Sequence, residues 1–160
     1  MSEEKISKDL IGQDLGGKTF RIKKKKLLAF AESIGATQDK YLDPDDPIAH
    51  PAYANAYVFP ALMKVNSAKD KNGKPLIKNL LKILHGGQGY RFPTDAPPIQ
   101  DGDKIKTNAK IKNIEAKSNG MLVIDVEATS KIKKSKKDES KVGKTVCISD
   151  IGVIVMPGGW

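Results

Sequence analysis

Two histidines, His50 and His85, are the side chains of this sequence best suited to acid–base chemistry near neutral pH. They are too few for a histidine-rich metal site within one chain. The single cysteine, Cys147, excludes an internal disulfide and a cysteine-based zinc site. The sequence contains no glycine-rich phosphate loop, no Ser-His-Asp order and no cysteine nucleophile pattern. We therefore expect no metal and no cofactor.

Positive charge is the second chemical feature, because 28 lysines and arginines face 19 carboxylates and give a net charge of +9. Much of this excess lies in two clusters, Lys23 to Lys26 and Lys131 to Lys141. Such runs usually form solvated surface, but they could also attract nucleic acid or the phosphates of coenzyme A. No zinc finger, RNA-binding aromatic strand motif or helix-turn-helix accompanies the lysines, so we do not expect nucleic acid as a partner.

Length and composition indicate one globular domain. A chain of 160 residues, 39% hydrophobic and 29% charged, can bury a core of its own. Its longest apolar runs, such as Ile151 to Met156, are too short to span a membrane. Residues 1–17 are polar and lack the apolar centre of a secretory signal. We expect a cytoplasmic protein with a flexible arm over residues 1–17 and one domain over residues 18–160.

The first half of the sequence predicts two helices. Residues 19–22 alternate like a short strand, and the apolar spacing from Leu27 to Ile34 is helical, with Gly35 suited to end the helix. Residues 41–47 contain two prolines and three aspartates and should form a loop. A second helix should begin at Pro51, since proline fits the first helical turn, and Pro60 should kink or end its first part.

The second half predicts antiparallel strands. From residue 81 the apolar period changes to two, and Ile105 to Ile111 alternates with lysines as a strand with one buried face does. Ser118-Asn119-Gly120 is a turn before a second alternating strand over residues 121–129. The segment 131–144 is charged enough to be a solvated hairpin tip, and residues 145–156 form the last strand. The fold class is therefore α+β, with an antiparallel sheet wrapped around the second helix.

Four segments taken together resemble the N-terminal hot-dog half of MaoC-like dehydratases. They are residues 35–43, Pro47-Ile48-Ala49-His50, Leu84-His85-Gly86-Gly87-Gln88 and Asp101-Gly102-Asp103. The same half occurs in fatty-acid-synthase-type and mycobacterial two-subunit hydroxyacyl dehydratases, and the resemblance covers residues 18–156. It implies a single hot-dog fold whose sheet pairs with a second subunit. We expect that pairing at an edge formed by Val153-Ile154-Val155, an apolar strand that should not stay uncovered.

The resemblance also implies a lost catalytic dyad. The family's catalytic loop, Gly-Asp-x-Asn-Pro-x-His-x-Asp, matches residues 35–43 with Ala36 at the Asp position, Gln38 at the Asn position and Tyr41 at the His position. Alanine has no proton to transfer, and an ordinary tyrosine, with a pKa of about 10, is a poor base near neutral pH. Catalytic members carry Gly after Pro-Ile-x-His, where its N–H holds the thioester oxygen. Pro51 stands there in this chain and has no N–H.

The function implied is that of a non-catalytic or partner subunit of an (R)-specific enoyl/3-hydroxyacyl-thioester hydratase-dehydratase. It would bind acyl-CoA or a similar acyl thioester, as a homodimer or beside a catalytic MaoC-like subunit. One alternative is an active enoyl-CoA hydratase that uses Asp45 and His50, which have the separation of the family's Asp and His. Another is a stand-alone acyl-CoA-binding or scaffolding module. The candidate substrate-binding residues are His50, Tyr53, His85, Gly86, Gly87 and Gln88, although Tyr53 and His85 also suit plain packing roles.

Overall fold

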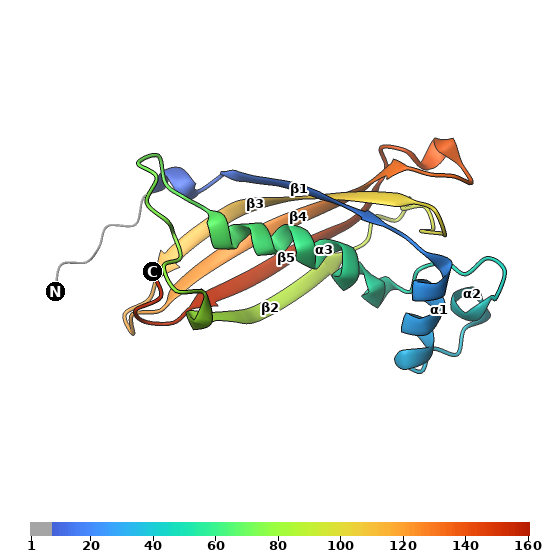
Figure 1. Cartoon of the computed structure of the whole chain (residues 1–160), viewed down its shortest axis with the longest axis horizontal. Helices are drawn as coiled ribbons and strands as arrows, with labels where there is room; N and C mark the ends of the chain where they lie inside the picture. Colours follow the sequence, from blue (N-terminus) through green and yellow to red (C-terminus); the bar gives the residue numbers. More distant parts are fainter. Residues whose placement is uncertain (1–7) are drawn as a thin grey trace.

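A computed structural model describes residues 8–160 and shows five antiparallel strands in one sheet, in the order β1-β3-β4-β5-β2. Helix α3 lies across one face of the sheet, and α1 and α2 gather at one end (Figure 1). This arrangement confirms the predicted α+β class, with a sheet around a central helix. The strands are β1 (Asp14–Arg21), β2 (Ile83–Arg91), β3 (Lys104–Ala116), β4 (Leu122–Lys134) and β5 (Thr145–Val155), and the helices are α1 (Lys24–Ser33), α2 (Asp39–Leu42) and α3 (Ala54–Leu62).

The core lies between α3 and the inner face of the sheet. Side chains alternate across a strand, so β3 buries Ile105 and Ile111 completely while the lysines between them point outward. Strand β4 alternates in the same way. Tyr57 and Val58 of α3 are at most 2% exposed and pack onto this face. The alternation predicted for both strands is confirmed.

Helix α3 begins near the predicted proline. Residues 51–53 form a 3₁₀ turn that leads into the helix, with Pro51 in its first turn. The chain passes Pro60 and leaves the α-helix two residues later, at Leu62, for a second 3₁₀ turn over Met63–Ser67. Pro60 has no N–H to donate to the preceding turn, which weakens the helix where it tightens.

The fold begins earlier than the predicted boundary at residue 17. Strand β1 pairs with β3 from Asp14 onward, and Leu10 is only 2% exposed. The N–H of Gly12 donates to the carbonyl of Ile111 at 2.8 Å, which fixes the preceding turn to the sheet. The prediction of a flexible arm is therefore wrong for residues 8–17, whose pairing partner lies about a hundred positions away. The rest of that arm, residues 1–7, lies outside the described residues.

Two further predictions are corrected by the sheet. Strand β5, with Val153-Ile154-Val155, lies between β4 and β2 and is not an edge; the edges are β1 and β2. The segment 131–144 is not fully solvated, because Lys141 is 3% exposed. Its ammonium donates to Asp103 Oδ2 at 2.8 Å and to Gln100 Oε1 at 3.1 Å. The lysine-rich tip is thus fastened to the turn before β3.

Among residues 8–160 no helix combines the length and apolar character needed to cross a membrane.

Candidate functional site

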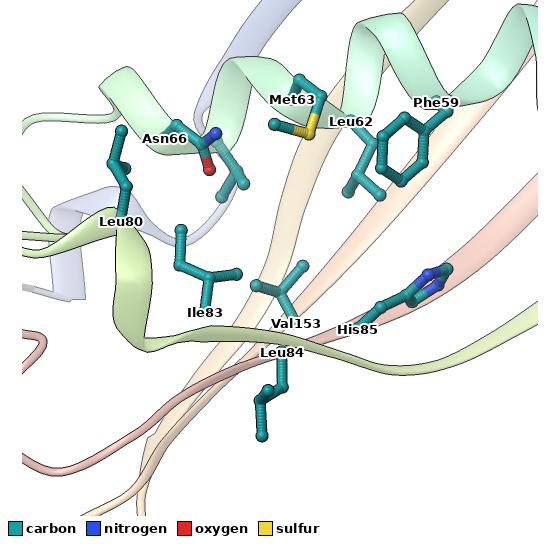
Figure 2. Close-up of a pocket in the computed structure, with 10 residues that line it drawn as sticks. Phe59, Leu62, Met63, Asn66, Leu80, Ile83, Leu84, His85 and Val153 are labelled. Carbon is teal, nitrogen blue, oxygen red and sulfur yellow. The ribbon is translucent and has the colours of Figure 1, made fainter.

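An apolar groove of about 370 Å³ runs between the C-terminal half of α3 and strand β2. Figure 2 shows Phe59, Leu62 and Met63 directed into it from the helix side, with His85 rising from the strand toward Phe59. The amide of Asn66 and the imidazole of His85 are the polar groups of this lining. The lining consists of Phe59, Leu62, Met63, Val65, Asn66, Leu80, Ile83, Leu84, His85 and Val153. A space lined this way suits an extended apolar chain with one polar group near His85.

His85 owes its position to an irregularity in β2. The pairing of β2 with β5 shifts between His85 and Gly87, which leaves Gly86 as an extra residue. A Cβ on Gly86 would lie 2.7 Å from the Cδ1 atom of Ile154, whereas a Cβ on Gly87 would meet nothing within 4 Å. A side chain at position 86 would therefore force the partly buried Ile154 to shift. The exposed imidazole of His85 lies 6.3 Å from the Phe59 ring, centroid to centroid.

Gln88 is tied into the sheet instead of facing the groove. Its Nε2 atom donates to Ser149 Oγ at 3.1 Å, and Ser149 Oγ donates to the carbonyl of Gly89 at 3.0 Å. Of the candidate segment 85–88, only His85 lines the groove. Gly86 and Gln88 hold the strand in its irregular shape.

The loop that resembles the catalytic loop lies at the other end of α3. Gly35 ends α1 with a φ of 68°, in the left-handed region that glycine adopts readily. Tyr41, at the position of the family's histidine, is 8% exposed, and its ring packs edge-on against His50 at 4.7 Å. A phenol ring therefore fills the space beside His50.

His50 serves as the N-terminal cap of the turn that begins α3. Its Nδ1 atom accepts the N–H of Ala52 at 3.1 Å, so the ring carries its proton on Nε2. Phe30 flanks the imidazole on a second side, at 6.4 Å. This role accounts for His50 without a ligand.

Tyr53 belongs to the core. It is 5% exposed, and its ring contacts Phe30 at 5.3 Å and Phe20 at 6.4 Å. Burial raises the pKa of its phenol above the ordinary value. The packing role, which the sequence left open for Tyr53, is the one the contacts describe.

Asp45 and His50 are not joined in the part of the chain that the structure describes. Asp45 is exposed, and its N–H donates to Asp43 Oδ1 at 2.8 Å within a tight turn. The neighbouring Asp46 instead accepts from Gln100 Nε2 at 3.0 Å and pairs with Lys137. The carboxylate that anchors this loop is thus Asp46, and no hydrogen bond or ion pair links Asp45 to the imidazole among residues 8–160.

The candidate residues therefore fall into two groups, one around His50 at the start of α3 and one around His85 in the groove. Phe59, which contacts His85, follows His50 by nine positions, a separation of roughly 14 Å along a helix. The groove's helix side, Leu62 to Asn66, was missed by the sequence interpretation. The sequence signal for it is a cluster of apolar residues after Pro60, which is too wide to be buried on one face of a helix.

One buried pair beneath α3 takes no part in either group. Burial raises the pKa of the Cys147 thiol to about 11, although a hydrogen bond with Tyr57 acts in the opposite direction. Burial also raises the pKa of Tyr57 far above its ordinary value. Both groups stay neutral near pH 7.

No three histidine, cysteine or carboxylate side chains within residues 8–160 lie close enough together to hold a metal ion.

Comparison with known proteins gives a match to a family model and a curated relative from yeast. The model of the family described as FAS1-like, dehydratase domain region, matches residues 9–137. The fatty acid synthase subunit beta of Saccharomyces cerevisiae is 29% identical over 115 residues. That match covers 71% of this chain but 5% of the yeast protein, so the chain spans a small part of that relative.

Solved structures show the same hot-dog fold. The HadBC complex of Mycobacterium tuberculosis, a 3R-hydroxyacyl-ACP dehydratase, aligns with a TM-score of 0.65 at 12% identity, over 93% of this chain and 99% of that one. The (R)-hydratase PhaJ1 of Pseudomonas aeruginosa aligns with a TM-score of 0.61 at 18% identity, over 94% of this chain and 84% of that one. At these identities the likeness supports the fold alone.

Proposed function

The chain belongs to the FAS1-like dehydratase domain region family, and from this membership we propose that it is a non-catalytic partner subunit of an (R)-specific enoyl/3-hydroxyacyl-thioester hydratase-dehydratase. In this role it binds acyl-CoA or a similar acyl thioester, and a catalytic hot-dog subunit beside it performs the chemistry.

The observation that carries the proposal is the packing of Tyr41 on His50. Hydration of an enoyl thioester needs two positioned groups that activate water. This chain has Ala36 and the buried Tyr41 at the positions that resemble those groups, and His50 is engaged by the Ala52 N–H. Pro51 also removes a backbone donor for the thioester oxygen. The two positions that would activate a water molecule therefore carry no suitable base, and Tyr41 occupies one side of His50.

The groove supports a role in acyl binding. Each methylene group that moves from water into such a lining contributes about 0.8 kcal/mol. The groove is also incomplete in the single chain, because Phe59 is 40%, Met63 46% and Leu84 51% exposed. These residues lie beside β2, an edge strand with unpaired backbone groups. A second hot-dog subunit that pairs with β2 would cover the groove.

Two measurements on the purified chain test this function. First, the chain alone should not hydrate enoyl-CoA thioesters of short or medium length. Loss of a positioned acid–base group costs ~10²–10⁴-fold, and loss of one oxyanion donor ~10²–10³-fold. Turnover at ordinary enzyme rates that His50→Ala abolishes would refute the proposal in favour of an active hydratase.

Second, calorimetry should detect binding of a saturated medium-chain acyl-CoA in the groove. Met63→Glu places a charge in the lining and should weaken this binding at least tenfold. Val142→Glu is the matched control, because Val142 is also 46% exposed but lies in the lysine-rich tip. Equal affinities of the two variants would remove the groove from acyl binding. A failure to pair with any catalytic hot-dog subunit in a pull-down, with acyl binding intact, would favour the stand-alone module.

A further inference from the structure

Positive side chains from three strands meet in register on the outer face of the sheet. Arg21 of β1 lies directly opposite Lys104 of β3, and Lys104 lies opposite Lys134 of β4. In the next row, Lys106 lies opposite Lys131. We call these five residues the basic rows. Lys23 to Lys26 begin α1 two residues after Arg21, at the same end of the sheet (Figure 1). Both lysine clusters of the sequence therefore lie toward this end of the sheet.

The basic rows have no carboxylate partners. None of their five side chains forms an ion pair with any residue from 8 to 160, and four of them are exposed, with Lys104 half-buried. Farther along the same face the charges are balanced. There Arg91 pairs with Asp150 at 3.0 Å, and Lys112 lies 3.8 Å from Glu127. The outer face thus divides into a neutralised half and a wholly positive half.

This division is unfavourable for the isolated chain. Like charges directly opposite each other on adjacent strands destabilise a sheet, since strands lie only about 4.8 Å apart. A carboxylate in place of Lys106 or Lys131 would remove the repulsion, as Glu127 does in the neutralised half. An external anion spread over the rows would relieve the same repulsion.

From the nature of these side chains we propose that the basic rows adsorb to the anionic surface of a phospholipid bilayer. Four of the five are lysines, whose ammonium groups act as point charges and need no paired geometry. Base recognition in nucleic acids relies on bidentate arginine or on aromatic stacking, and protein interfaces are depleted in lysine. The rows contain one arginine and no aromatic residue, and they spread over three adjacent strands in two dimensions, as a planar partner requires.

Vesicle sedimentation tests the proposal with the full chain. The protein should sediment with vesicles of phosphatidylcholine and phosphatidylserine (about 7:3) at low salt but not with phosphatidylcholine alone. Each lysine near such a surface contributes about fivefold. The triple variant Lys104→Gln, Lys106→Gln, Lys131→Gln should therefore lower the partition coefficient about a hundredfold. Binding should also fall steeply with salt, because the Debye length shortens.

Two control variants and a folding measurement test whether binding depends on positive charge at the basic rows. Lys69→Gln, Lys71→Gln, Lys82→Gln removes the same charge from the segment at the opposite end of the sheet and should bind as the wild type does (Figure 1). Replacing Lys104, Lys106 and Lys131 by arginine should preserve binding. Thermal unfolding should show that every variant is folded.

Several outcomes would overturn the proposal. They are equal binding to the two kinds of vesicle, equal losses in the two glutamine variants, and tighter binding to duplex DNA or poly-glutamate than to the vesicles at equal charge concentration. Binding of free coenzyme A that the Lys104, Lys106 and Lys131 substitutions weaken would instead assign the rows to the thioester ligand. Acyl-CoA binding in the groove is measured separately, so its failure leaves this test intact.

Discussion

Replacing Asp103 by asparagine should destabilise this protein more than any surface change of similar size. Asp103 is completely buried and its partner Lys141 is 3% exposed, with 2.8 Å between carboxylate and ammonium. The second carboxylate oxygen accepts from Ser135 Oγ at 2.6 Å, and the N–H of Gln100 donates to the first at 2.9 Å. Asp103→Asn leaves the ammonium buried without a countercharge.

The expected cost follows from that burial. Removal of one partner from a buried pair costs about 3–5 kcal/mol, against a total stability of about 5–15 kcal/mol for a domain of ordinary size. With an m-value of ~2 kcal/mol/M, the urea midpoint should fall by about 1.5–2.5 M. The assay is equilibrium urea unfolding followed by circular dichroism.

Two companion variants decide whether the charge is the cause. The double variant Asp103→Asn, Lys141→Met removes both charges and should recover most of the loss, to within about 1–2 kcal/mol of the wild type. Arg91→Gln breaks two surface pairs, because the 58% exposed Arg91 contacts Asp150 (56% exposed) and Glu127 (28% exposed). The loss of each such pair should cost about 0.2–1 kcal/mol. The reasoning is refuted if Asp103→Asn costs no more than Arg91→Gln, or if the double variant is the least stable of the three.

The remaining predictions concern the cap, the bulge and the buried thiol. His50→Ala should lower the free energy of unfolding by about 1 kcal/mol because it removes the cap on Ala52, whereas His50→Asn should retain most of it; equal losses in urea unfolding would contradict the capping role. Gly86→Ala should cost about 1–2 kcal/mol in the same assay through its contact with Ile154, and Gly87→Ala, with open space around its Cβ, should cost little; the reverse order would rule out the packing argument. The pKa of Cys147 is raised by burial from 9.0 to about 11, so below pH 9 the thiol is protonated in both states and stability is unaffected by its titration. As pH rises from 9 to 11, the thiol of the unfolded chain ionises while the buried thiol stays protonated. Ionisation therefore favours the unfolded chain, and the free energy of unfolding falls. Thermal unfolding against pH should therefore fall more steeply for the wild type than for Cys147→Ala, and parallel curves would contradict the shift.

Local pattern explains why much of the fold could be predicted. The alternation on β3 and β4 records which side chains touch α3, because a strand turns successive residues to opposite faces. The start of α3 was also local, since Pro51 and its flanking residues favour a first helical turn. Strand β1 was placed only in part, because residues 14–17 contain two glycines and no alternation. Its hydrogen bonds come from β3, and nothing in a short window signals them.

The candidate site divides along the same line. Motif order pointed to His50, Tyr41 and His85, but it could not show that the first two pack together while His85 lies at the far end of α3. The apolar groove depends on how α3 leaves Pro60 and how β2 bends at Gly86, so it exists only after the helix and the strand are packed.

Short-range periodicity and residue chemistry encode three properties of this protein that could be predicted. These are the α+β class, the buried faces of β3 and β4, and the absence of an acid–base group at Ala36. Two other properties depend on packing between distant segments: β2, and not β5, lies at an edge of the sheet, and Lys141 is buried against Asp103. Strand order and ion pairing are set by contacts between residues tens of positions apart. Such contacts produce no periodic pattern in the sequence of either segment, so a short window cannot predict them.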